Sequence, residues 1–504
     1  MSRGDIRFTK KQGSKRSAAP GNDYISGLLI YTGSLPSGFT TSANVKQLFS
    51  LADAENAGIV NDYSDETKAT ATYLITDVGA TDDTINITID EPFQTVDLGT
   101  YTRASTDTTE TKVGDGVAAT INAGTRDHDY TAVNTDGSVV ITSKSGLGIF
   151  LNTKSITATI VGTITATNTA FSGGVAGKLA VYHYAIAENF RGNPNSTLYV
   201  GFYPVPSTYA FTEITLLQSF ANGSLRQLGI FKNAAYNVAD LTAINTEVVN
   251  NNDNRHKPLS ILYAADLSAT TDITTVSDLS ILNNTKVSSI IGQDGAGQGA
   301  FLYKTTGKSV TQLGITLGIL SLSAVSEDFG EPAQFNLTDG TENNVPAFAN
   351  GQLLADPLLG DNALDAIDKK RHIFGMQYIG YSGTYFNENH CACSFTNSFA
   401  YINDNRVIDK AIRGIYSALI PYLKGKILKN ADGTIVATTL AFYQTEAITP
   451  LYQMQRDGDL SAVTDSDVYI DPSQNVVING GLTIVVSLNE ADIARNIFVP
   501  ISYK

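Results

Sequence analysis

Cysteine is scarce in this chain. Cys391 and Cys393 are the only two cysteines in 504 residues, and on a strand a one-residue spacer would point both side chains to the same face. Two such residues do not supply a disulfide framework. We therefore expect packing or assembly to stabilise the protein.

Long apolar runs are absent as well. No run approaches the ~18 residues that a membrane-spanning helix needs, and the basic first 16 residues lead into polar sequence rather than the apolar core of a secretory signal. Hydrophobic residues make up 42% and charged residues 16% of the chain, as in folded proteins. The sequence predicts a protein without direct membrane insertion, which stays in the cytosol unless it leaves inside a particle.

Negative charge dominates the chain, with a net charge of -15, but the first 16 residues carry six basic residues against one acidic residue. This stretch has a balance of +5, so the remainder has -15 minus +5, or -20. So acidic a body is not expected to bind nucleic acid or anionic lipid. The sequence indicates a basic arm attached to an acidic body.

Alternating strands and helices after residue 177 predict βαβ units and a mainly parallel sheet. A further helix is expected over residues 309–326, although Gly314 and Gly318 lower its propensity. The expected strands of this sheet are 197–205, 227–231, 259–264 and 287–291, with a strand at 24–31 and a helix at 42–57 before them.

Residues 69–174 have a different composition, rich in Thr, Asp, Gly and Val with polar and apolar residues alternating. This pattern predicts an inserted small β module with one helix near residues 117–122. The fold class is therefore α/β and β multidomain. The expected divisions are 1–22 (N-terminal arm and linker), 23–68 (start of the main body), 69–174 (β module), 175–366 (α/β domain), 367–481 (C-terminal inner domain) and 482–504 (C-terminal strand arm).

A long helix is expected over residues 404–428, with Pro421 kinking it. Its apolar stripe consists of Ile408, Ile412, Ile415, Leu419 and Leu423. The other face carries Lys410, Arg413 and Lys424, which form a basic cluster in an acidic body. Such a cluster is compatible with a surface that contacts another protein. A solvated helix face is the simpler interpretation, and the two explain the pattern nearly equally well.

Glycine-rich and metal-ligand patterns give weak signals for chemistry. Residues 307–309 read GKS, but Leu302 stands where a phosphate-binding loop needs glycine, and the glycines of residues 292–299 depart from the dinucleotide fingerprint. His390, Cys391 and Cys393 lack a second ligand pair at metal-site spacing. We expect a βα loop, buried thiols, no metal and no cofactor.

Several segments resemble contractile tail sheath proteins: the basic arm, LFSLADAE at 48–55, residues 182–204 with the turn GNPN at 192–195, NENHC at 387–391 and NRVIDK at 405–410. The resemblance covers most of residues 1–60 and 177–504. It implies a non-enzymatic structural subunit with an inner portion made from both chain ends, which forms hexameric rings stacked helically around an inner tail tube protein. It also implies contacts with baseplate and tail terminator proteins, and a virion or phage-tail-like particle assembled in the bacterial cytoplasm.

Strand-like segments at both chain ends, residues 5–9 and 493–501, have no local partner. An isolated strand becomes stable only when it joins a sheet edge, so we expect these arms to pair with neighbouring subunits. The arm contacts are expected at Ile6, Phe8, Ile493, Ile497 and Val499. Lys410, Arg413 and Lys424 are the candidates for facing the tube.

Two other classes of function remain open from the sequence. The Thr-rich insert is compatible with a surface-displayed β-rich adhesin or binding module, although a secretion signal is missing. The predicted parallel sheet is compatible with an enzyme that binds a ligand at the carboxyl ends of its strands.

Overall fold

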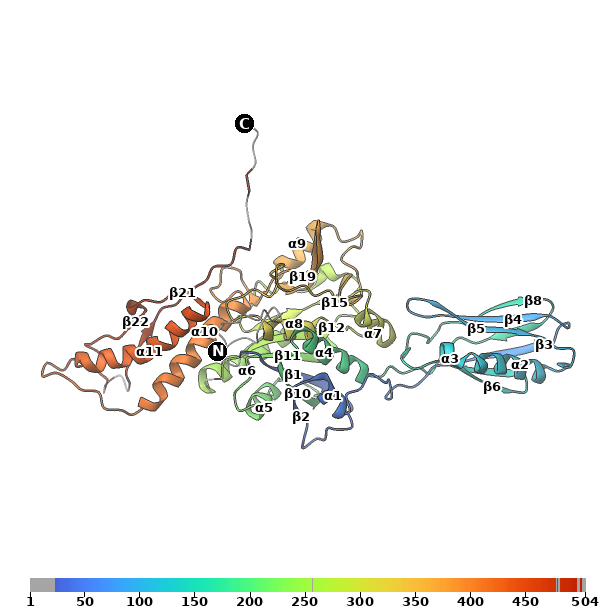
Figure 1. Cartoon of the computed structure of the whole chain (residues 1–504), viewed down its shortest axis with the longest axis horizontal. Helices are drawn as coiled ribbons and strands as arrows, with labels where there is room; N and C mark the ends of the chain where they lie inside the picture. The colour runs from blue at the N-terminus through green and yellow to red at the C-terminus, as the bar shows by residue number, and fades with distance from the viewer. Residues whose placement is uncertain (1–22, 256, 477, 479–480, 496–498, 501–504) are drawn as a thin grey trace, which may run out of the picture.

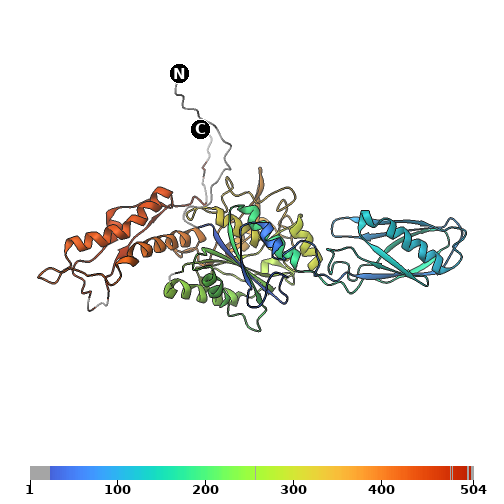
Figure 2. The same ribbon diagram turned by 60° about the horizontal axis from the view of Figure 1, so that its bottom comes forward.

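The computed structural model describes residues 23–500 except 256, 477, 479–480 and 496–498. Figure 1 shows an elongated molecule, with a β module at one end, a central α/β body and a pair of long helices at the other end. Figure 2 shows the same order after a 60° turn. No helix among the described residues is long and apolar enough to cross a membrane.

A seven-stranded sheet forms the centre of the body, in the order β17-β14-β12-β11-β1-β10-β2. Its strands are β1 (Ile25–Thr32), β2 (Val45–Leu48), β10 (Thr197–Pro204), β11 (Gln227–Ala235), β12 (Ser260–Asp266), β14 (Val287–Ile290) and β17 (His372–Ile373). Only β2, at one edge, pairs antiparallel among these described strands. The predicted mainly parallel sheet is confirmed, and it includes residues on both sides of the expected division at 366.

Helices cover both faces of this sheet because β1 is apolar on both sides. Leu28 and Ile30 pack in one core with α4 (Leu179–Gly192) and α8 (Leu313–Leu322), while Leu29 and Tyr31 pack in another core with α5 (Glu213–Phe220) and α6 (Val238–Arg255). This arrangement makes the body a doubly wound α/β unit.

Helix α8 is shorter than the predicted 309–326 and lies buried against α4. A Cβ atom at Gly314 would come within 2.1 Å of the Ala185 carbonyl oxygen, and one at Gly318 within 2.3 Å of the Asn189 carbonyl oxygen. The two glycines therefore permit close helix packing that offsets their low helix propensity.

The β module has its own core, built from two sheets and the helix α2 (Glu110–Ala123). The sheets are β6-β7-β3-β9 and β5-β4-β8, with β3 (Thr70–Asp77), β4 (Thr84–Asp90), β5 (Thr95–Thr102), β6 (Thr131–Thr135), β7 (Ser138–Thr142), β8 (Thr157–Val161) and β9 (Thr165–Asn168). Its two connections to the body pair with each other at Thr67 and Val175. The ends of the module therefore lie close together.

A C-terminal helical unit projects from the body on the side away from the module (Figure 1). It contains α10 (Ile402–Leu419) and α11 (Ala437–Asp457). Short two-stranded pairs flank them, β21 (Leu460–Ala462) with β24 (Asn489–Glu490) and β22 (Val468–Tyr469) with β23 (Val485–Val486). Gly414 of α10 faces Pro450 of α11, where an added Cβ would approach the proline Cβ to 2.8 Å.

Three further predicted helices differ from the structure. Residues 45–48 form strand β2 on the sheet edge, and the helix of this region, α1 (Leu51–Asn56), begins only where Ser50 caps it by accepting a hydrogen bond from the Asp53 amide. The module helix is longer than predicted because Thr109 caps it at residue 110. Pro421 does not kink a helix to 428: α10 ends at Leu419, and a 3-10 turn follows.

Candidate functional site

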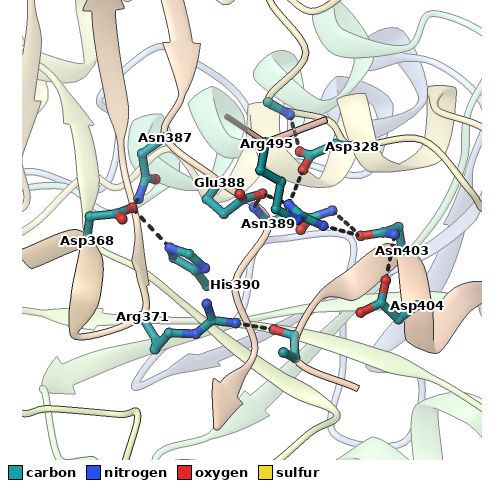
Figure 3. A network of polar contacts seen from close by, with 12 residues as sticks. Asp328, Asp368, Arg371, Asn387, Glu388, Asn389, His390, Asn403, Asp404 and Arg495 are labelled. Carbon is teal, nitrogen blue, oxygen red and sulfur yellow. Dashed lines mark hydrogen bonds and ion pairs between the residues drawn. The ribbon is translucent and has the colours of Figure 1, made fainter. Parts of the chain in front are cut away.

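Polar side chains gather where the last described residues of the chain meet the body (Figure 3). Arg495, from the stretch that follows β24, lies among Asp328, Glu388 and Asn403. These three come from the loop after α8, the loop before β20 (Ala392–Cys393) and the first turn of α10. The chain end is thus held by segments that are far apart in the sequence.

The guanidinium group of Arg495 is contacted on its edge and on its face. Its Nη1 donates to Asp328 Oδ2 at 2.8 Å and to Glu388 Oε1, and its Nη2 donates to Asn403 Oδ1 at 3.4 Å. Its Cζ lies 3.4 Å from the centre of the Tyr401 ring. We call Asp328, Glu388, Tyr401 and Asn403 the arginine cradle.

Burial controls the electrostatics of the cradle. The side chains of Asp328 and Glu388 are 11% and 15% exposed. Burial, followed by the neighbouring Glu388, raises the pKa of Asp328 to about 8, whereas the charge of Arg495 lowers it. Burial, followed by Glu490, raises the pKa of Asp404 next to the cradle to about 6. The carboxyl of Asp328 is therefore harder to ionise than an exposed carboxyl.

A second polar layer supports the cradle from below. His390 Nε2 lies 3.0 Å from Asp368 Oδ1, and Asn387 donates to the same oxygen at 2.7 Å. Arg371 donates to the Ala400 carbonyl and has its Cζ 4.7 Å from the centre of the Tyr401 ring. Burial lowers the pKa of His390, so it acts here as a neutral hydrogen-bonding group.

The start of the described chain is held by the same helix, α10. Asp23, just before β1, accepts from Arg413 Nη2 at 2.6 Å and lies 3.5 Å from Lys410 Nζ. Lys410 also donates to Asp459, after α11, at 2.5 Å. Asp23 and Asp459 are almost fully buried, with side chains 2% and 1% exposed. Helix α10 thus anchors both ends of the described chain.

The sequence-predicted tube-facing residues separate into two environments. Lys410 and Arg413 are mostly buried and take part in the ion pairs with Asp23 and Asp459. Lys424 lies beyond the end of α10 and is exposed. The structure therefore does not bring the three together as one exposed basic face.

Only some of the predicted arm residues lie in the part of the chain that the structure describes. Ile6, Phe8 and Ile497 lie outside the described residues. Ile493 is half-buried and Val499 is exposed, and neither belongs to a strand of the described chain. The described strands nearest the C-terminus are β23 and β24.

In the glycine-rich segments, the groups that could contact a phosphate are already bound to side chains of this protein. Gly307 ends helix α7 (Gln298–Thr306) rather than opening a helix, and Lys308 pairs with Asp266 at 2.7 Å. At the start of α7, the Gln298 amide donates to Glu342 Oε1 at 2.6 Å. A carboxylate in this position takes the place that a phosphate would occupy.

The His-Cys pattern is part of the packed interior. Cys391 and Cys393 are buried free thiols, and burial raises the pKa of Cys391 to about 12. His390 is engaged with Asp368. Within the described part of the chain, no group of three His, Cys, Asp or Glu side chains is arranged to hold a metal ion.

The sequence analysis singled out the NENHC segment, residues 387–391, by its resemblance to sheath proteins, but it did not predict the contacts that these residues make. Glu388 contacts Arg495, and Asn389 donates to Asn403 Oδ1 at 2.8 Å. Arg495 and Asp328 are separated by 167 positions, so spacing along the chain gives no signal for their contact. A motif dense in Asn, Glu and His before a buried strand was the detectable sign of a polar network.

Comparisons with known proteins concern the C-terminal unit and the whole chain. The C-terminal domain of the DUF2586 family matches residues 398–504, and no curated protein matches the chain. The helical sheath of the anti-feeding prophage in its contracted state is 10% identical, with 100% of this chain and 99% of that chain covered and a TM-score of 0.48.

Two further solved structures are similar. A sheath tail protein from Desulfitobacterium hafniense is 11% identical, with 97% of this chain and 100% of that chain covered and a TM-score of 0.36. A chain of the anti-feeding prophage baseplate in its contracted state is 13% identical, with 65% and 85% covered and a TM-score of 0.39. The structural neighbours are thus two sheath proteins and a chain of a baseplate.

Proposed function

We propose that this chain is a structural subunit of a contractile tail sheath, which polymerises as stacked hexameric rings around an inner tube and contracts to drive it through a target cell envelope. The observation that carries the proposal is an exposed apolar surface on the C-terminal helical unit. The sequence segments that resemble sheath proteins support it, and two of them lie in the polar network and in α10.

The exposed apolar surface follows one side of α10 and continues past its end. Ile412 is 46% exposed, Ile420 42% and Leu423 69%. Phe399, Leu428 and Phe442 add further exposed apolar area. Large exposed apolar side chains gathered on one unit favour a contact with another protein, and contacts between unlike surfaces of identical subunits generate helical polymers when they do not close into a ring.

A groove beside this surface provides a place for an arm. It has a volume of about 340 Å³ and lies between α10 and the strand region of β23 and β24. Its lining residues are Ser398, Phe399, Val407, Ile408, Ala411, Ile412, Ile415, Val486, Leu488 and Glu490. We propose that residues 5–9 of a second copy occupy it, with Ile6 and Phe8 in the apolar part.

Charge and strand pairing favour this occupant. The first 16 residues have a balance of +5 against an acidic body, and the groove has a carboxylate, Glu490, in its lining. Strand β23 pairs with β22 alone among the described strands, so a further strand could add to its second edge. Ile493 and Val499 would belong to the corresponding arm at the other chain end.

Polymerisation tests the proposal directly. The purified chain should form tubes visible by electron microscopy, and Leu423→Asp should prevent them because a charge would be buried in the contact. Val133→Asp is the matched control, since Val133 is 68% exposed on the β module. Wild-type protein that stays monomeric at high concentration, or Leu423→Asp tubes identical to wild type, would contradict the proposal.

The proposed binding of the N-terminal arm in the groove can be tested with a truncated protein and a separate arm peptide. Protein lacking residues 1–16 should stay folded but not polymerise, and a synthetic peptide of residues 1–22 should bind to it, less tightly as salt increases. A peptide with Ile6→Asp and Phe8→Asp is the control. Equal binding of both peptides would remove the groove as the arm site.

Contact with the inner tube is tested at Lys424. Charge reversal at Lys410 or Arg413 would break the ion pairs with Asp23, and would therefore not isolate a tube contact. Lys424 is exposed, so Lys424→Glu should leave empty sheath tubes intact and reduce co-assembly with tube protein. Unchanged tube-filled particles would count against a tube-facing role.

A further inference from the structure

We propose that the arginine cradle is a reversible binding site for a guanidinium group, and that Arg495 is its resident ligand. The C-terminal stretch would then dock on the body of its own subunit through one side chain and be able to leave it. This proposal does not depend on the sheath function, because it concerns a contact within a single chain.

The chemistry of the cradle matches a guanidinium group better than an ammonium group. Asp328, Glu388 and Asn403 present oxygens to Nη1 and Nη2 of Arg495, and the Tyr401 ring faces its planar carbon. A guanidinium group is flat, carries donors along its edge and stacks on aromatic rings. A lysine ammonium group would lose the stacking and could not reach the separate acceptors in the same way.

The body holds the cradle side chains in place by hydrogen bonds that do not involve Arg495. Asp328 Oδ1 accepts from the Gly330 amide at 2.7 Å, and Glu388 Oε1 accepts from the Asn389 amide at 3.0 Å. Asn403 is fixed on both sides, by Asn389 at 2.8 Å and by Asp404 at 2.7 Å. An emptied cradle should therefore keep its shape and accept the ligand again.

The stretch that carries the ligand has few other attachments. For residues 491–495, Arg495 makes the only side-chain hydrogen bonds and ion pairs to other described residues. The preceding strand β24 pairs with β21 over only two residues. Removing one guanidinium contact should therefore release the stretch as far back as β24.

Release should be coupled to a proton. Asp328 and Glu388 face the same guanidinium, and the charge of Arg495 lowers the pKa of Asp328. When the guanidinium leaves, this pKa rises and the cradle takes up a proton, so binding tightens as pH increases. The other titratable or charged groups that surround the site are Asp368, Arg371, Tyr378, His390, Tyr401, Asp404 and Glu490.

Chemical rescue tests the proposal. Arg495→Ala protein should bind N-acetyl-arginine amide saturably in calorimetry, whereas wild type should need much higher ligand concentrations because Arg495 competes for its cradle. N-acetyl-lysine amide should bind at least about tenfold more weakly, because its ammonium group keeps its charge but loses the stacking and reaches fewer of the separate acceptors. Binding of the arginine ligand should be tighter at pH 9 than at pH 6. A folded Arg495→Ala protein that binds neither ligand, or both equally, would overturn the proposal.

Controls locate the binding in the cradle. Adding Asp328→Asn to Arg495→Ala should weaken binding of the arginine ligand and flatten its pH dependence, whereas Asp361→Asn, at the exposed start of α9 (Asp361–Lys369), should change neither. Binding that persists unchanged with Asp328→Asn would place the ligand elsewhere.

A second measurement covers the case in which Arg495→Ala does not fold. A fluorophore on Val499→Cys in otherwise wild-type protein reports on the mobility of the chain end, since Val499 is exposed and both native thiols are buried. Saturating N-acetyl-arginine amide should lower its anisotropy and the lysine ligand should not. Unchanged anisotropy at saturation would contradict reversible docking.

Discussion

Arg413 Nη2 donates a hydrogen bond to Asp23 Oδ1 at 2.6 Å, joining residues 390 positions apart. Asp23 lies at the beginning of the described chain, and α10 belongs to the C-terminal unit. The same helix starts at the arginine cradle. A pull on either chain end would therefore be transmitted to α10.

Removing Asp23 should destabilise the protein more than removing Arg413. Asp23→Ala leaves Lys410 and Arg413 without their shared carboxylate partner, and loss of one partner of a buried ion pair costs about 3 kcal/mol or more. Arg413→Met leaves Lys410 to neutralise Asp23 and should cost about 1 kcal/mol. Urea denaturation measures both, with the exposed Lys424→Met as a control that should change little. Equal losses for the two variants would show that Lys410 does not compensate.

The parallel sheet was predictable because its signals are local. Apolar runs at residues 24–31, 227–231, 259–264 and 287–291 were separated by helical patterns, and the structure has strands at each of them. Strand β2 was not predictable, because residues 45–48 carry a helical apolar spacing and become a strand only by pairing with β10.

The site was far less predictable than the sheet. Lys410 and Arg413 were correctly recognised as neighbours on one helix face, but the partner of that face, Asp23, is at the other end of the sequence. Arg495 and Asp328 gave no sign of their contact for the same reason. Ion pairs between distant segments leave no periodic pattern, so they follow from the fold and not from the sequence pattern.

The two glycines of α8 should be needed for its packing. Gly318→Ala would place a Cβ within 2.3 Å of the Asn189 carbonyl oxygen in the α4 backbone, which must move. We expect a loss of about 1–3 kcal/mol, although alanine favours helix by about 1 kcal/mol. The measurement is the urea midpoint and slope. Gly360→Ala, where an added Cβ meets nothing within 4 Å, is the control, and a stabilised Gly318→Ala would contradict the packing argument.

The β module should be removable. Its connections pair at Thr67 and Val175, and its core is separate from the cores of the body. Replacing residues 69–174 by a short Gly-Ser linker should leave the body folded and able to polymerise, because the ends already lie close together. The stability lost should be limited to that of contacts between the module and the body, such as the Lys304 ammonium group over the Phe93 ring. Circular dichroism and electron microscopy test folding and assembly; a folded body that no longer assembles would show that the module makes contacts between subunits.

Both thiols should be unreactive in the native protein. Cys391 and Cys393 are buried, and burial raises both pKa values, that of Cys391 to about 12. Since the thiolate is the reactive form, little of it exists at pH 8. A thiol reagent should label neither residue until the protein unfolds, whereas the exposed Val499→Cys should react at once. Rapid labelling of two native thiols would show that the strand region around β20 opens readily.

His372 should make the body sensitive to acid. Its ring is fully buried between Ser289 Oγ, at 3.2 Å, and the Ser277 carbonyl, at 2.9 Å. Burial lowers its pKa from 6.5 to about 4. Between these values the unfolded chain binds a proton that the folded protein does not, so stability falls as pH decreases from about 6.5 toward 4. At pH 5 this histidine alone should cost about 2 kcal/mol of folding stability relative to pH 8.

His372→Gln keeps a side chain able to hydrogen-bond but does not titrate. Its unfolding free energy, measured with urea at both pH values, should therefore depend less on pH than that of wild type by about this amount. His183→Gln is the control, because His183 pairs with the half-exposed Glu55 outside the core. If His372→Gln and wild type lost the same stability between pH 8 and pH 5, buried His372 would not be the source of the acid sensitivity.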